Sequence, residues 1–91
     1  MGLTIQQFFD YVGSMTENKP GVVLKGKKDS DEIYYKIHIA HDKFFIDTIK
    51  DIESQKNIDD RYILDKDEVQ TFKVKVMELL KKINVENIYL E

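Results

Sequence analysis

The 91-residue chain contains no cysteine and a single proline, and its glycines are few and scattered. Without cysteine there can be no disulfide, no thiol nucleophile and no Cys-ligated metal. The scattered glycines form no phosphate-binding loop, and the serines lie in no nucleophile-elbow context. No apolar run approaches the length of a membrane span, and the N-terminus lacks a secretory pattern. We therefore expect a cytoplasmic protein that is not an enzyme, has no cofactor and does not enter a membrane.

Positive charge is also scarce, because the formal net charge is −3 and Arg61 is the only arginine. An acidic chain does not attract polyanions as a whole, and bidentate reading of phosphate or guanine relies on arginine. Nucleic acid is therefore a disfavoured partner. The abundance of Lys, Ile, Asp and Asn is typical of AT-rich genomes, which suggests a phage or other mobile element as the source.

The remaining composition is that of a folded protein. Hydrophobic residues make up 42% of the chain and charged residues 34%, which is too apolar for a disordered segment. A chain of this length fits one domain, so residues 1–91 are predicted to form a single unit with a modest core.

Two segments carry capping signals followed by apolar residues at helical spacing. Thr4 and Gln7 have capping-box spacing, which predicts a helix over residues 5–15. Asp65 and Glu68 repeat the signal before a helix predicted over residues 66–83. The apolar stripes comprise Ile5, Phe8, Phe9, Val12 and Met15 in the first helix, and Val69, Phe72, Val76, Leu79, Leu80 and Ile83 in the second. Each stripe requires an apolar layer to cover it.

Alternating apolar and polar residues on either side of "KKDSDE" predict an antiparallel hairpin. A two-residue turn at 29–30 brings both apolar sets onto one face, because register is set by parity. It places Leu24 opposite Tyr35. It also places Lys27 opposite Glu32, where we expect a cross-strand ion pair.

The segment "AHDKFFIDTIKDI" permits two interpretations. Asp42 could cap a helix, or a turn at His41 and Asp42 could lead into a third strand. The strand interpretation pairs Ile39 with Phe44, Ile37 with Ile46, and Lys36 with Asp47. Its aromatic and β-branched content favours the strand. Residues 51–64 are expected to be a polar connection with at most a short turn or strand, and "VENIYL" is predicted to add one further strand.

These elements define an α+β fold of order α-β-β-β-α-β, with an antiparallel three- to four-stranded sheet and two helices packed on one face. The core of this order is similar to that of the double-stranded RNA-binding domain. That family grips phosphates with positive residues at the start of its last helix. This chain has Asp65, Asp67 and Glu68 there instead. The likeness is one of topology, and no residue role follows from it.

The sheet face turned away from the helices is the first candidate site. Its predicted residues are Val23, Lys25, Tyr34, Lys36, His38, Phe45 and Ile49. Aromatic rings among lysines suit single-stranded nucleic acid, whereas open sheet faces also bind proteins or simply remain solvated. The prediction places Arg61 outside this face. A covering by residues 51–64 would instead make the face a second core.

The second candidate is acidic and comprises Asp59, Asp60, Asp65 and Asp67. These carboxylates lack the spacing and glycine of a calcium loop, and Asp65 and Asp67 are explained by the predicted helix start. An acidic patch could still dock on a basic partner. His38 and His41 have HxxH spacing but no nearby third ligand, so we expect no metal site.

The sequence therefore favours a non-enzymatic protein-interaction protein, such as an accessory, adaptor or inhibitor protein. Its partner is an unidentified protein, and homodimerisation by strand addition at an exposed edge is a further expectation. The exposed edge is expected to be either residues 22–27 or the C-terminal "NIYL". The alternative is a nucleic-acid-binding module that uses the aromatic and lysine face.

Overall fold

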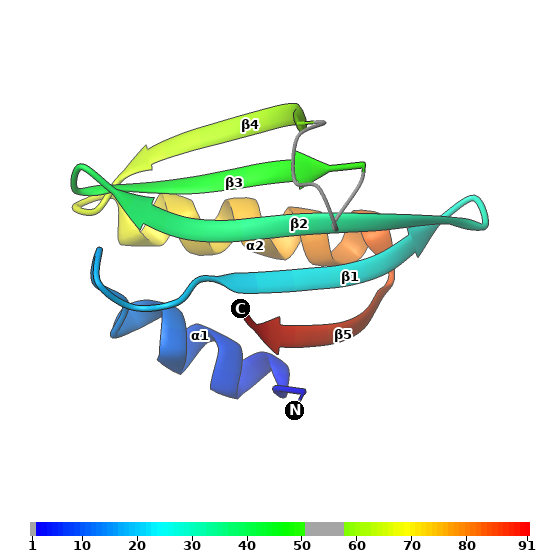
Figure 1. Ribbon diagram of the computed structural model, residues 1–91, viewed down its shortest axis with the longest axis horizontal. Coiled ribbons are helices and arrows are strands. Elements are labelled where there is room, and N and C mark those ends of the chain that lie inside the picture. Colours follow the sequence, from blue (N-terminus) through cyan, green and yellow to red (C-terminus); the bar gives the residue numbers. More distant parts are fainter. Residues whose placement is uncertain (1, 51–57) are drawn as a thin grey trace.

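The computed structural model describes residues 2–50 and 58–91, except for the side chain of residue 59 (Figure 1). Within these ranges lie two helices and five strands. They are α1 (Ile5–Gly13), β1 (Val22–Lys28), β2 (Asp31–Ala40), β3 (Lys43–Ile49), β4 (Ile58–Asp65), α2 (Val69–Ile83) and β5 (Val85–Leu90). The α+β class and the antiparallel sheet are as predicted.

The strands form one antiparallel sheet in the order β4-β3-β2-β1-β5. Both predicted two-residue turns are present, because Asp29 and Ser30 have φ of 54° and 72°, and His41 and Asp42 have φ of 53° and 59°. Positive φ at both central residues gives a hairpin the twist of its strands. The predicted registers of β1 with β2 and of β2 with β3 are therefore confirmed.

The predicted strand count and order are wrong, since the chain runs α-β-β-β-β-α-β. The extra strand is β4, which falls in the expected polar connection; residues 51–57 of that connection lie outside the described residues. Tyr62 and Leu64 face the helices while Arg61 and Ile63 face the other way, so the alternation of a strand was present. The acidic residues around it concealed the pattern. This order also departs from that of the double-stranded RNA-binding domain.

The two helix starts turn out differently. At α1 the capping box is confirmed. The main-chain N–H of Gln7 donates to Thr4 Oγ1 at 3.1 Å, and the main-chain N–H of Thr4 donates to Gln7 Oε1 at 3.0 Å. At α2 the predicted box is wrong: Glu68 occupies the N-cap and its side chain makes no capping hydrogen bond. Asp65 instead ends β4 and pairs with Lys43 at 3.2 Å.

Both helices contribute to one core on the same face of the sheet; Figure 1 shows α2 behind β2 and β3, and α1 beside the end of the sheet formed by β1 and β5. The core includes Phe8 and Val12 of α1, Met15 just beyond the end of α1, Phe72, Val76, Leu79, Leu80 and Ile83 of α2, and Val22, Leu24, Tyr35, Ile37, Ile39, Phe44, Ile46 and Ile88 of the sheet. The rings of Phe44 and Phe72 stack with centroids 4.3 Å apart. Two predicted core residues, Ile5 and Val69, are about half exposed.

The end of α2 lies directly against β1. A Cβ placed on Gly26 would approach the carbonyl oxygen of Ile83 to 2.3 Å, so only glycine fits at this point of β1. Asn84 then takes a left-handed conformation with φ of 45°, which ends the helix and starts β5. Because β5 pairs with β1, β1 is an interior strand. Of the two alternatives for an edge, residues 22–27 are therefore wrong, and the C-terminal strand β5 does lie at an edge of the sheet.

No helix in the described part of the chain is both long enough and apolar enough to cross a membrane.

Candidate functional site

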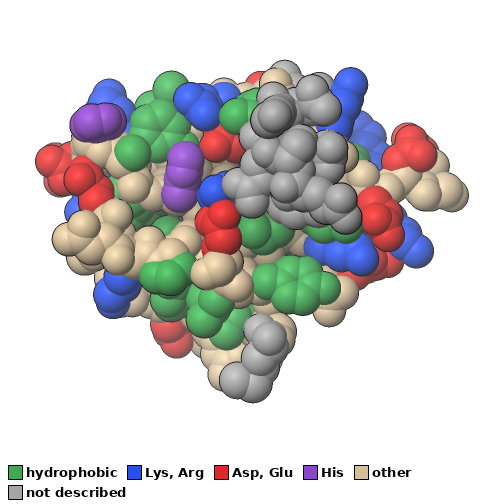
Figure 2. Space-filling view, viewed as in Figure 1, with side chains coloured by type: hydrophobic (Ala, Val, Ile, Leu, Met, Phe, Trp, Pro, Cys, Tyr) green, Lys and Arg blue, Asp and Glu red, His purple; other side chains and the backbone are tan. Residues whose placement is uncertain are grey.

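The outer face of the sheet, meaning the face turned away from both helices, carries the first candidate set as the sequence placed it. Lys25 lies opposite Tyr34, and Tyr34 opposite Ile49 on the next strand. His38 lies opposite Phe45, and β4 continues the row with Ile63 beside Phe45. Figure 2 views this side of the molecule and shows apolar side chains divided by charged ones.

The outer face is only partly open. Val23 and Ile49 are 7% and 2% exposed, so these two candidates offer a partner almost no surface. Lys25, Tyr34, Lys36, His38 and Phe45 are half-buried. Ile63, which the sequence analysis did not assign to any site, is 52% exposed and is the most open apolar side chain in this row.

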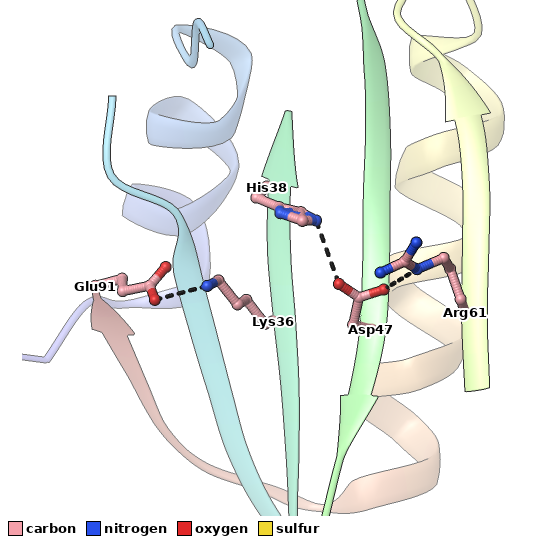
Figure 3. Close-up of polar contacts among 5 residues, drawn as sticks. All are labelled: Lys36, His38, Asp47, Arg61 and Glu91. Carbon is pink, nitrogen blue, oxygen red and sulfur yellow. Dashed lines mark hydrogen bonds and ion pairs between the residues drawn. The ribbon is translucent and has the colours of Figure 1, made fainter. Parts of the chain in front are cut away.

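A buried carboxylate lies in the middle of the outer face. Asp47 of β3 is only 3% exposed. Arg61 of β4 donates from Nε to Asp47 Oδ1 at 2.5 Å, while His38 of β2 places Nε2 3.2 Å from Oδ2 (Figure 3). The predicted register of Lys36 with Asp47 is correct, but the ammonium of Lys36 binds Glu91 at 2.7 Å instead. Three strands therefore contribute to one polar cluster, His38–Asp47–Arg61.

The surroundings of His38 favour its neutral form. Burial lowers its pKa below the ordinary value of 6.5, and this outweighs the opposing effect of the Asp47 carboxylate. The ring contacts Phe45 edge-on, with centroids 5.2 Å apart, and the Arg61 guanidinium lies 5.3 Å from the Phe45 ring centroid. No hydrogen bond of suitable geometry reaches His38 Nε2 from the described residues. Aromatic and polar groups are thus interleaved at the centre of the face.

The cluster His38–Asp47–Arg61 was not predicted because residues 51–64 were expected to be a connection. The prediction that Arg61 lies outside the outer face is wrong, because β4 places it on that face opposite Asp47. One signal was available: Asp47 interrupts an aromatic and β-branched strand at an outward position. A carboxylate there needs a cation from a neighbouring strand when it is buried.

The cations described on the outer face have carboxylate partners. Lys25 binds Glu32 at 3.6 Å, and Lys36 binds Glu91 at 2.7 Å. At the hairpin end, Lys27 pairs with Glu86 of β5 at 3.3 Å, so the predicted Lys27–Glu32 ion pair is wrong although the register is right. Glu32 lies closer to Lys25 and also accepts from the Tyr34 hydroxyl at 3.1 Å. Positive charge on this face is therefore locally neutralised.

The acidic candidates do not form one patch. Asp60 lies opposite Thr48 and Asp65 opposite Lys43, and an odd spacing along β4 puts the two on opposite faces. The side chain of Asp59 lies outside the described residues. Asp67 is exposed beyond the end of β4. The prediction of a single acidic docking patch assumed that these residues lie in an irregular segment. Because β4 is a strand, that prediction is corrected.

A hollow of about 480 Å³ lies between the β2–β3 turn and the start of α2. Its lining mixes the two charges and consists of His41, Asp42, Lys43, Asp65, Lys66 and Asp67. Within the described ranges, no three His or carboxylate side chains come together in a way that could hold a metal ion. His38 and His41 are separated, since one lies in the polar cluster of the outer face and the other in the turn.

Comparisons of the chain with protein families, with curated proteins and with solved structures find no match.

Proposed function

We propose that this is a small non-enzymatic interaction protein, an accessory, adaptor or inhibitor protein, that binds a protein partner through the outer face of its sheet. The observation that carries the proposal is the pairing of outer-face cations with carboxylates of the same chain, next to partly exposed Tyr34, Phe45 and Ile63. Aromatic residues and arginine are enriched at the centres of protein interfaces, whereas free lysines are depleted there.

The ion pairs favour a protein partner over a nucleic acid. Polyanion binding gains free energy when unpaired protein cations neutralise phosphates and release the counterions condensed around them. Lys25, Lys36 and Arg61 each have a carboxylate partner, so a phosphate would have to compete with a group already in place. A protein surface gains instead by covering the rings and the exposed Ile63 side chain.

The geometry also favours a rigid contact. The three central strands β1, β2 and β3 each pair on both sides, and the Asp47 cluster ties β2, β3 and β4 together on the outer face. A surface held in this way loses little conformational entropy on binding. We therefore expect a preformed interface whose backbone does not rearrange.

The test is co-purification of partners from cells that express the chain, with variants that change one face at a time. Phe45→Glu introduces a charge at the centre of the outer face and is expected to abolish capture, with an unchanged circular dichroism spectrum. Val74→Glu is the matched control, because Val74 is 51% exposed on α2. Capture lost with Val74→Glu and kept with Phe45→Glu would place the interface on the helix side and contradict the proposal.

The nucleic-acid alternative gives a separate result. In a titration with fluorescent single-stranded oligonucleotides at low salt, we expect no change in anisotropy. Binding that weakens steeply with added salt and is lost with Tyr34→Ala would replace the protein-partner proposal, because stacking on this ring would then supply affinity.

A further inference from the structure

The two edges of the sheet differ in how far they are covered. At the β5 edge, the Leu3 amide donates to Ile88 O at 2.9 Å and Gly2 forms a bridge with Tyr89. The N-terminal segment therefore occupies part of that edge. At the other edge, β4 pairs with β3 alone among the strands of the described part of the chain. An eight-residue edge strand that presents main-chain donors and acceptors is a template for another strand.

The direction of the main-chain groups of β4 follows from its hydrogen bonds. The Lys66 amide reaches Asp42 O at 3.3 Å on the β3 side. The Arg61 main-chain amide, in contrast, donates to Asp60 Oδ1 at 2.9 Å. Because successive residues of a strand direct their main-chain groups to opposite sides, Arg61, Ile63 and Asp65 direct theirs toward the free edge.

We propose that a second copy of this chain pairs antiparallel with β4, with the two-fold axis at Ile63. An isologous contact of this kind requires that the strand complement itself. About this axis Arg61 lies opposite Asp65 of the second copy, and Asp60 lies opposite its Lys66, the turn residue that directly follows β4. Each pair of opposite charges occurs twice. Tyr62 faces Leu64 of the second copy on the helix side, and the two Ile63 side chains meet on the outer face.

The neighbouring registers do not have this complementarity. An axis at Arg61 would set two guanidinium groups opposite each other, and an axis at Asp60 would set two carboxylates opposite each other. An axis at Tyr62 would place Asp60 opposite Leu64 and Arg61 opposite Ile63, so neither charge would face an opposite charge. Like charges that lie directly opposite destabilise a strand pair, so the charge pattern selects the Ile63 axis.

The dimer joins two five-stranded sheets edge to edge and makes their outer faces continuous. Ile63 is 52% exposed in the single chain and would be covered by its own copy. The dimer uses the main-chain edge and the charges of β4, whereas the proposed partner contact centres on the rings of Tyr34 and Phe45; the two surfaces share Ile63.

The test measures mass by sedimentation velocity from micromolar to millimolar concentration. The intact chain is expected to approach twice its mass of 10.8 kDa as concentration rises. Asp60→Lys and Lys66→Asp each create like-charge pairs across the axis, so each variant alone is expected to remain a monomer. Mixed together they restore two pairs of opposite charge, and a heterodimer is expected.

Asp10→Lys is the matched control, because Asp10 is an exposed residue of α1 and the dimer does not involve it; this variant is expected to dimerise as the intact chain does. Ile63→Lys removes no core contact, places two like charges at the axis and is expected to be monomeric. A chain that stays monomeric throughout the concentration range overturns the proposal. So does dimerisation of either single charge variant, or of Ile63→Lys, at the concentration that suffices for the intact chain.

Discussion

Arg61→Met tests the buried ion pair at the centre of the outer face. The methionine keeps an apolar stem beside Phe45 but removes the donor to Asp47, whose side chain is 4% exposed. A charge-assisted hydrogen bond contributes about 1.5–3 kcal/mol, and loss of one partner of a fully buried pair costs about 3–5 kcal/mol. Because the Arg61 side chain is 43% exposed and partly screened by water, we expect the free energy of unfolding to fall by about 2 kcal/mol.

The assay is urea denaturation at neutral pH and low protein concentration, where the linear dependence on denaturant gives the free energy. Lys43→Met is the matched control, because the Lys43–Asp65 pair joins the same two strands but both side chains are about half exposed. It should cost less than about 0.5 kcal/mol.

A double-mutant cycle isolates the pair. In an Asp47→Asn background there is no buried charge to leave unpaired, so Arg61→Met should cost about 1 kcal/mol less than in the intact chain. Equal costs in both backgrounds, or a cost no greater than that of Lys43→Met, would refute the reasoning that Arg61 compensates the buried carboxylate.

Three further predictions concern the scaffold. Gly26→Ala would force a Cβ against the Ile83 carbonyl, where the approach is 2.3 Å, and should cost about 2–3 kcal/mol in the same urea assay; a loss below about 0.5 kcal/mol would contradict the close packing of α2 on β1. Thr4→Ala removes the α1 cap and should lower the free energy of unfolding by about 1 kcal/mol; Thr16→Ala, at an exposed threonine outside both helices, is the control. Because the folded-state pKa of His38 is lowered, the unfolded chain binds a proton first, so stability should fall as the pH drops below about 6.5; His38→Gln should flatten that slope, and an unchanged slope would assign it to other groups.

Much of the fold could be predicted from the sequence because local signals agreed with tertiary packing. Two-residue turns, together with the requirement that one face of each strand be apolar, predicted the pairing of Leu24 with Tyr35 and of Ile37 with Ile46. The Thr4 box marked the true start of α1. Where local and tertiary demands differed, the prediction failed: Asp65 has capping spacing, but it is held in β4 opposite Lys43.

The site was less predictable for a related reason. The strand β4 carries aspartates that read as a loop, and its pairing with β3 brings Arg61 to the outer face beside Asp47. The partners of Lys25 and Lys36 also depend on long-range geometry, since Glu91 reaches Lys36 only because β5 returns to pair with β1. Such contacts cannot be predicted from spacing along the chain, so the ion pairing of the outer-face cations became evident only from the sheet order.

Photo-crosslinking from the outer face tests most directly whether this face is the interaction surface. A photoreactive phenylalanine analogue at Phe45 keeps the shape of the native ring in its half-buried position, and the same analogue at the exposed Val74 of α2 reports on the opposite side. In cells that express the chain, we predict one discrete adduct from position 45 and none from position 74, identified by mass spectrometry as a protein other than this chain. An adduct from position 74 with none from position 45 would contradict the assignment of the outer face as the interaction surface.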